Sequence, residues 1–110
     1  MDIDLIRQKL RSFAAERDWE QFHNPKNLAM ALSCEAAELM EIFQWLTHEE
    51  SYALKESDEQ MARVADEMAD VALYLVRFAD ILGVDLEAAM LRKMDKNAER
   101  YPAGNASPRA

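Results

Sequence analysis

Two pairs of acidic residues stand inside apolar stripes that repeat at helical spacing. The first stripe reads Leu28, Ala31, Glu35, Glu38, Ile42 and Trp45. The second pair, Glu67 and Asp70, lies along the edge of a ridge made of Val64, Met68, Val71, Leu75, Phe78 and Leu82. Residues three apart share a helix face, and an ionised carboxylate costs several kcal/mol to desolvate, more than a buried leucine contributes. The pattern therefore predicts two long antiparallel helices whose four carboxylates surround a positive charge.

That positive charge is expected to be a hard divalent cation. An all-oxygen set of ligands is typical of Mg²⁺, with Mn²⁺ as the alternative. A di-iron centre fits less well, because di-iron bundles use Glu-x-x-His on two helices. The chain has one such string, Glu20-x-x-His23, in an expected loop, and His48 has no glutamate three residues before it.

Composition and capping residues predict an all-α fold. The chain has two glycines and three prolines, and half of its residues are apolar. Apolar periodicity indicates four helices, over residues 2–17, 24–46, 57–82 and 85–100. Each begins at a residue type that favours the N-cap: Asp2, Asn24, Ser57 and Asp85. Between them we expect an aromatic-rich loop over residues 18–24 and a polar connection over residues 47–56.

The predicted helix over residues 57–82 is apolar on two sides between Val71 and Val76. Leu73 and Val76 point away from the ridge that would face the other helices. A single domain of 110 residues has too little chain to cover both sides. We therefore expect a homo-oligomer, with residues 1–102 as the folded domain and residues 103–110 as a flexible tail.

Charge and hydropathy argue against two classes of partner. A formal charge of −8 opposes binding to nucleic acid, and no apolar run approaches the ~20 residues of a membrane span. The acidic N-terminal sequence lacks the basic and apolar segments of a signal peptide, and the single cysteine, Cys34, fits a reducing compartment. We expect a cytoplasmic protein that acts on a small molecule.

Cationic and polar side chains share one face of the predicted C-terminal helix. Lys93, Asn97 and Arg100 recur at helical spacing, and Tyr101 follows them. Cations near a helix C-terminus also interact favourably with the helix dipole, which explains the set without any ligand. Opposite an acidic cluster that holds a metal ion, binding of phosphate oxygens becomes the favoured role.

Aromatic residues flank the helix that carries the first acid pair. Trp19, Phe22 and His23 precede it, and Trp45 lies near its end on the acidic stripe. Flat rings can stack on a nucleobase, and a histidine can hydrogen-bond the edge of a base. The alternative is that Trp19 and Phe22 cap the bundle.

Together these residues resemble the all-α NTP pyrophosphohydrolase superfamily, which contains the MazG proteins and whose hallmark is Glu-x-x-Glu followed by Glu-x-x-Asp. More specific segments are similar to its dCTP pyrophosphatase branch. These segments cover residues 13–23, 25–28, 43–45, 93–97 and 100–102. The likeness runs from residue 3 to residue 102. The connection between Trp45 and Ser57 departs from it, because it is shorter than in animal members and lacks their glycines and prolines.

The resemblance implies a four-helix, MazG-like bundle that assembles as a homotetramer. It also implies Mg²⁺-dependent hydrolysis of a dNTP, first of all dCTP or a 5-modified dCTP, to dNMP and pyrophosphate. The implied metal ligands are Glu35, Glu38, Glu67 and Asp70, with Glu38 and Glu35 as catalytic carboxylates. The implied substrate contacts are Trp19, His23, Trp45, Lys93, Asn97 and Tyr101. The alternatives are a broad house-cleaning dNTPase, dUTP included, and a non-catalytic acidic interaction module.

Overall fold

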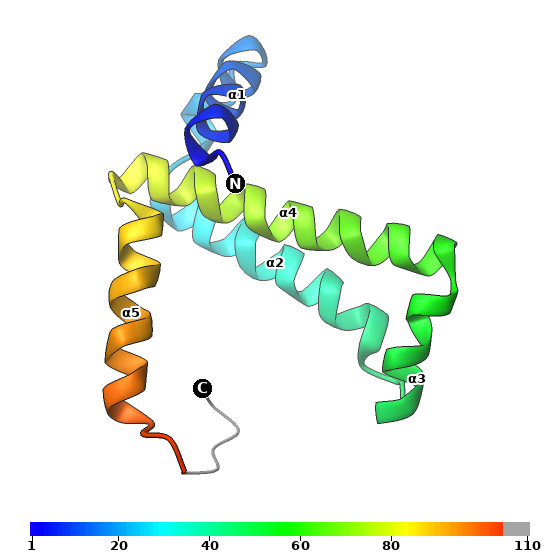
Figure 1. Cartoon of the computed structure of the whole chain (residues 1–110). Helices are drawn as coiled ribbons and strands as arrows, with labels where there is room; N and C mark the ends of the chain where they lie inside the picture. The colour runs from blue at the N-terminus through cyan, green and yellow to red at the C-terminus, as the bar shows by residue number, and fades with distance from the viewer. Residues whose placement is uncertain (105–110) are drawn as a thin grey trace.

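The computed structural model describes residues 1–104, and this part of the chain is helical without a strand (Figure 1). The α-helices are α1 (Ile3–Glu16), α2 (Pro25–Phe43), α3 (His48–Ala53), α4 (Asp58–Leu82) and α5 (Leu86–Arg100), and two short 3₁₀ turns, η1 (Glu20–Phe22) and η2 (Leu54–Glu56), join them. The all-α prediction is confirmed. The predicted tail over residues 103–110 lies, from residue 105 onwards, outside the described residues.

The predicted helix starts are confirmed by their caps. The side chains of the four expected capping residues each accept a hydrogen bond from a backbone N–H three residues on: Asp2, Asn24, Ser57 and Asp85. Pro25 takes the first position of α2, where its missing N–H costs nothing. Gly83 ends α4 with a φ of 70°, in the left-handed region that glycine enters without a steric penalty.

The prediction of four helices is wrong by one short helix. The expected polar connection contains α3, and α2 ends at Phe43 rather than near residue 46. At the start of α3, Thr47 accepts the N–H of Glu50, and the Glu50 side chain accepts the N–H of Thr47. This reciprocal capping box offsets the weak cooperativity of a helix of 6 residues, which has no apolar stripe to reveal it.

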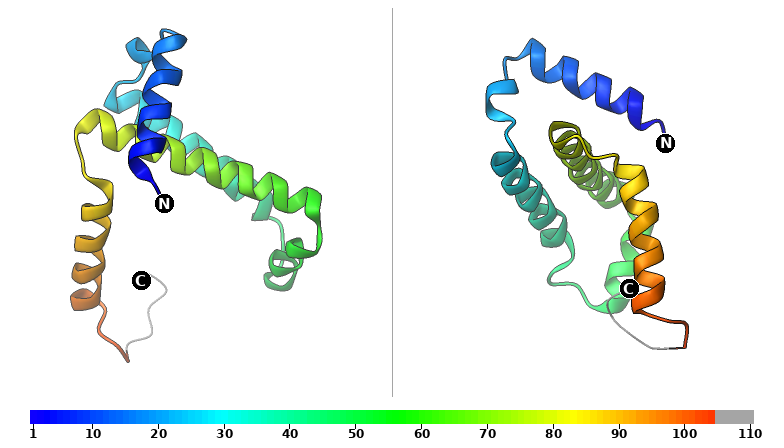
Figure 2. Two further views of the ribbon diagram at one scale, coloured as in Figure 1. Left: turned by 45° about the horizontal axis from the view of Figure 1, so that its top comes forward. Right: turned by 90° about the vertical axis from the view of Figure 1, so that its left-hand side faces the viewer.

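Helices α2 and α4 lie side by side and antiparallel, and they form the main contact of the chain (Figures 1 and 2). Helix α1 crosses α4 near the C-terminal end of α4. After Gly83, α5 turns away from the α2–α4 pair. The buried apolar residues are Ala14, Leu28, Ile42, Val64, Val76 and Ala79. Val76 therefore packs inside the chain, and the expectation that it points to an outer face is wrong.

A single copy of the chain is open for its size. Its solvent-accessible surface is 8646 Å², against about 6,200 Å² for a monomeric protein of this mass. Its radius of gyration is 16.9 Å, against about 13 Å for a compact domain of this length. Many large apolar side chains are exposed, and those on one face of α4 include Met61, Met68, Leu75 and Leu82. The sequence predicts three of these, Met68, Leu75 and Leu82, on the inner ridge, but in one copy of the chain they are exposed.

Because α4 is apolar on more than one side, spacing alone did not show which side meets α2. The exposed residues recur every seven positions, and Ala65 and Ala72 fill the positions between them. A repeat of seven is the spacing by which two helices pack along a common seam.

No helix within residues 1–104 has both the length and the hydropathy needed to cross a membrane.

Candidate active site

Three of the four predicted metal ligands meet in one cluster between α2 and α4. Glu35 and Glu38 come from adjacent turns of α2, and Glu67 comes from the facing side of α4. One carboxylate oxygen from each of the three lies within 4.8 Å of the others. The antiparallel pairing of the two helices thus brings together residues about 30 positions apart in the sequence.

Among the described residues, no lysine, arginine or histidine makes a salt bridge to Glu35, Glu38 or Glu67. Glu35 Oε2 and Glu67 Oε2 are buried, and neither has a hydrogen-bond partner among the described residues. Burial, a hydrogen bond with Glu38 and repulsion by neighbouring carboxylates raise the pKa of Glu35 to about 7. Burial and repulsion by Glu38 and Asp70 also raise the pKa of Glu67, although Arg63 opposes this. Unpartnered carboxylate oxygens that converge in this way fit a hard divalent cation.

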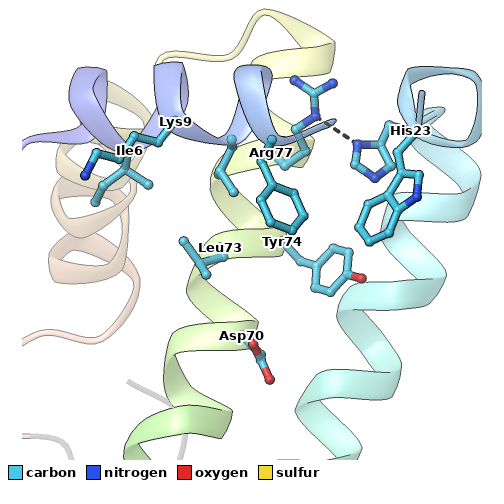
Figure 3. Close-up of a pocket in the computed structure, with 10 residues that line it drawn as sticks. Ile6, Lys9, His23, Asp70, Leu73, Tyr74 and Arg77 are labelled. Atoms are coloured by element: carbon cyan, nitrogen blue, oxygen red, sulfur yellow. Dashed lines mark hydrogen bonds between the residues drawn. The ribbon is translucent and has the colours of Figure 1, made fainter. Parts of the chain in front are cut away.

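Asp70, the fourth predicted ligand, lies beside the cluster rather than within it. Its charge contributes to the raised pKa of both Glu35 and Glu67, so it is close enough to interact with them. It also lines a neighbouring cavity of about 450 Å³ between α1, the segment before α2, and α4 (Figure 3). Asp70 therefore connects the acidic cluster to the cavity.

The cavity is mainly apolar and carries two of the predicted base-binding residues. Its lining consists of Ile6, Lys9, Leu10, Phe13, Trp19, His23, Asp70, Leu73, Tyr74 and Arg77. The Trp19 ring meets Phe13 edge-on, with ring centroids 5.5 Å apart, and lies 6.3 Å from the His23 ring. An apolar cavity with aromatic walls and a few polar groups suits a flat heterocycle.

A sharp turn after α1 directs Trp19 into this cavity. Asp18 has a φ of 56°, a left-handed conformation that aspartate tolerates better than most residues. The Trp19 N–H donates to the carbonyl of Ala14 at 2.9 Å, which closes the turn at the end of α1. The chain reverses here, so the tryptophan ring packs back against Phe13.

Two residues that the sequence did not single out complete the polar side of the cavity. Arg77 is 6% exposed, and its Nε–H donates to His23 Nδ1 at 3.0 Å (Figure 3). Tyr74 lies one turn before Arg77 on the same face of α4 and also lines the cavity. The spacing Asp70, Tyr74, Arg77, which repeats at helical period from a predicted ligand, was the available signal for both.

The remaining predicted substrate contacts lie elsewhere in a single copy of the chain. Trp45 is 86% exposed just after α2 and does not line the cavity. Lys93 and Asn97 lie on α5, and Tyr101 follows it. Figure 1 shows α5 projecting away from the paired helices that carry the acids. Within one copy, therefore, the structure unites the acids with Trp19 and His23 but not with these four residues.

This combination of fold and acidic cluster defines a MazG-like protein. The model of the MazG-like family matches residues 30–109, and the chain belongs to that family. The paired acids and the helical architecture that the sequence predicted are consistent with this membership.

Within the family, the chain is similar to dCTP pyrophosphatases, as its specific segments predicted. It is 50% identical to dCTP pyrophosphatase 1 from Homo sapiens over 101 residues, which cover 92% of this chain and 59% of that protein. The protein of the same name from Bos taurus is 48% identical over 100 residues, with coverage of 91% and 59%. The chain thus spans about 59% of the length of these curated relatives.

A solved structure supports the fold over nearly the whole chain. A pyrophosphatase from Archaeoglobus fulgidus superposes with a TM-score of 0.83 at 38% sequence identity. The match covers 93% of this chain and 94% of that one. The open arrangement of helices is therefore shared with an experimentally determined relative.

Proposed function

We propose that this chain is a Mg²⁺-dependent nucleotide pyrophosphohydrolase that converts a dNTP, first of all dCTP or a 5-modified dCTP, to dNMP and pyrophosphate. One observation carries the proposal: buried carboxylate oxygens, which have no hydrogen-bond partner within residues 1–104, lie next to an aromatic cavity. The similarity to dCTP pyrophosphatases supplies the substrate class. The functional unit in this proposal is residues 1–102, and its single cysteine is consistent with a cytoplasmic location.

In this proposal the metal ion is held by Glu35, Glu38 and Glu67, with Asp70 beside them. Mg²⁺ is preferred and Mn²⁺ is the alternative, because all four donors are carboxylate oxygens. When bound, the cation supplies charge neutralisation of the triphosphate and a lowered pKa for a coordinated water. Two of the three carboxylates keep a buried oxygen that has no hydrogen-bond partner among the described residues, so the cluster has the negative charge that would hold such a cation.

The chain's own residues divide the remaining work between the two halves of the site. Glu38 is the most exposed acid of the cluster, so it can accept a proton from the attacking water and pass it to solvent, with Glu35 assisting. The base enters the cavity beside Trp19, and His23 contacts its edge. Since Asp70 borders both regions, a nucleotide can reach from the cavity to the cluster along α4.

We further propose that the site is completed by assembly, with a homotetramer as the expected form. The large accessible surface and the exposed stripe on α4 favour burial against further copies. Trp45, Lys93, Asn97 and Tyr101, which lie outside the cavity in one copy, would then reach the site from another. Light scattering at micromolar concentration tests this part, and a monomer would remove it.

The activity itself is tested by a pyrophosphate-release screen with Mg²⁺ over all dNTPs, NTPs and 5-substituted dCTPs. We expect release from dCTP or a 5-modified dCTP with the highest kcat/KM. Similar kcat/KM values across bases would instead favour a house-cleaning dNTPase. The largely apolar cavity lining is compatible with this alternative, because it offers few groups that could hydrogen-bond the edge of a base. If no nucleotide releases pyrophosphate, the proposed activity is wrong, and the non-catalytic acidic interaction module becomes the favoured function.

The shared site makes a separate prediction for Trp45. If a second copy brings this ring onto the base, Trp45→Ala should raise the KM for dCTP about tenfold, because base stacking contributes about 1–3 kcal/mol per ring. Tyr52→Ala is the matched control, since Tyr52 is another exposed aromatic residue, on α3. Equal KM values in the two variants would place Trp45 outside the site.

A further inference from the structure

Arg77 is a buried cation that donates hydrogen bonds both to a histidine, His23, and to a carboxylate, Asp80. Its Nε–H donates to His23 Nδ1 at 3.0 Å, as the dashed line in Figure 3 shows. An arginine has donors and no acceptor, so Nδ1 must be the unprotonated nitrogen of the ring. A neutral imidazole carries one proton, which therefore sits on Nε2.

The charge around the ring also keeps it neutral. Burial and the nearby guanidinium of Arg77 both lower the pKa of His23. The neutral ring can accept the Arg77 N–H at Nδ1. A protonated ring would instead place its own Nδ1–H donor against that of Arg77. His23 accordingly offers the cavity one kind of polar group, an N–H donor.

A network anchored on Asp80 holds Arg77 in position. Arg77 Nη1 lies 3.4 Å from Asp80 Oδ2, and Arg11 from α1 binds the same carboxylate through Nε at 2.8 Å and Nη2 at 2.6 Å. Arg7 adds a third cation at 3.7 Å. Because Asp80 keeps two arginines without Arg77, the crossing of α1 over α4 does not depend on Arg77 alone.

We propose that Arg77 is a positioning residue that fixes His23 as a donor and thereby selects the base. This inference rests on the proposed function, because it concerns how the same cavity tells nucleobases apart. Cytosine has an acceptor at N3 and another at O2, whereas thymine and uracil carry an N–H at N3. An Nε2–H held in place can bond the cytosine N3 but meets the thymine or uracil N3–H donor to donor. A ring that was free to exchange tautomers could satisfy either base.

The test compares Arg77→Met with wild type in two measurements. We expect the ratio of kcat/KM for dCTP to that for dTTP and dUTP to fall about tenfold. A loss of this size is expected when one buried hydrogen bond no longer distinguishes two substrates. We also expect the ¹⁵N shifts of the His23 ring to change from a pure Nε2–H tautomer to a mixture. A residue with a merely structural role would not alter the tautomer.

Three further variants keep the test decisive. Arg77→Gln, whose amide can donate or accept, should lose selectivity as Arg77→Met does, and it replaces that variant if the latter does not fold. Arg77→Lys, which retains a donor-only group, should restore both the ratio and the tautomer. Arg11→Met is the matched control, because it weakens the Asp80 network and leaves the bond to His23 intact.

The outcomes separate this inference from the proposed function. A wild-type protein that releases no pyrophosphate overturns the proposed function, and the substrate selectivity inferred here with it. Active wild type together with an unchanged base ratio in both Arg77→Met and Arg77→Gln overturns the inference alone. A changed ratio without a changed tautomer overturns the role of His23 as the group that Arg77 positions.

Discussion

Helix α4 carries carboxylates in two surroundings of opposite sign. Toward its middle, Glu67 meets Glu35 and Glu38, and burial together with the neighbouring negative charges raises its pKa. Near its end, the hydrogen bond from Arg11 and the charges of three arginines hold the pKa of Asp80 below its usual value, although burial acts in the other direction. The same type of side chain on the same helix is thus destabilised in one place and stabilised in the other.

The difference separates a carboxylate that serves the fold from carboxylates that need a ligand. Asp80 has its charge compensated by Arg7, Arg11 and Arg77 within the chain, so nothing further need bind there. Glu35 and Glu67 each keep a buried oxygen that has no hydrogen-bond partner in the part of the chain that the structure describes. Uncompensated burial of this kind opposes folding, and a cation that binds the folded state relieves it.

Among substitutions of these carboxylates, loss of one charge from the acidic cluster should change the activity most. Glu38→Gln keeps the size of the side chain and removes one charge from the cluster. We expect kcat/KM to fall by about 100-fold or more, because the metal site supplies several kcal/mol of transition-state stabilisation. Glu41→Gln, an exposed glutamate on the same helix, should stay near wild type. A Glu38→Gln enzyme with near wild-type turnover would show that the cluster is structural.

Mg²⁺ should stabilise wild type against heat, and the loss of Glu38 should remove that response. At a Mg²⁺ concentration of 100 times its dissociation constant, the gain in unfolding free energy is about 2.7 kcal/mol. Asp80→Asn should melt earlier than wild type yet retain the full Mg²⁺ increment, since its charge is not part of the cluster. Thermal melts with Mg²⁺ and with EDTA measure both. An equal Mg²⁺ increment in Glu38→Gln and wild type would contradict a metal site at these carboxylates.

Local chemistry made the helix starts and the acid pairs predictable. Asn24 and Ser57 cap their helices by bonds that span three residues, so the sequence contains all the information needed. The pairing of Glu35 and Glu38 with Glu67 follows from helical spacing and from antiparallel packing of two long helices. The same logic, applied to Thr47 and Glu50, would have revealed α3.

The Asp80 network was not predictable, because it depends on how one helix crosses another. Arg11 and Asp80 are 69 residues apart, and nothing in the pattern of α1 shows which of its exposed cations meets α4. The direction of Trp19 likewise depends on the left-handed backbone at Asp18, where sequence suggested only a loop. The spacing on α4 also predicts that Met68 and Leu75 lie on the inner ridge, whereas both are exposed. When a helix is apolar on two sides, its sequence does not show which side packs against a neighbouring helix.

In the absence of metal, the pH dependence of stability should also distinguish Asp80 from the acidic cluster, although the difference in free energy is smaller. Asp80 has a lowered pKa in the folded protein, so its contribution is complete above the unfolded value near 4 and is lost as the pH falls through the folded value. Asp80→Asn should therefore be less stable than wild type by about 1 kcal/mol at neutral pH. This deficit should be constant between pH 5 and 8 and should shrink below pH 4.

Glu35 should behave in the opposite way. Its pKa rises to about 7 on folding, so the folded state favours the protonated form, and stability is lost as the pH rises from the unfolded value near 4 toward 7. Glu35→Gln should thus gain stability relative to wild type between pH 5 and 8, while the Asp80→Asn deficit stays level. Urea unfolding at fixed protein concentration in EDTA, at pH 3.5, 5 and 8, compares the three proteins. Parallel pH profiles for the two variants would mean that the two carboxylate sites do not differ as their surroundings imply.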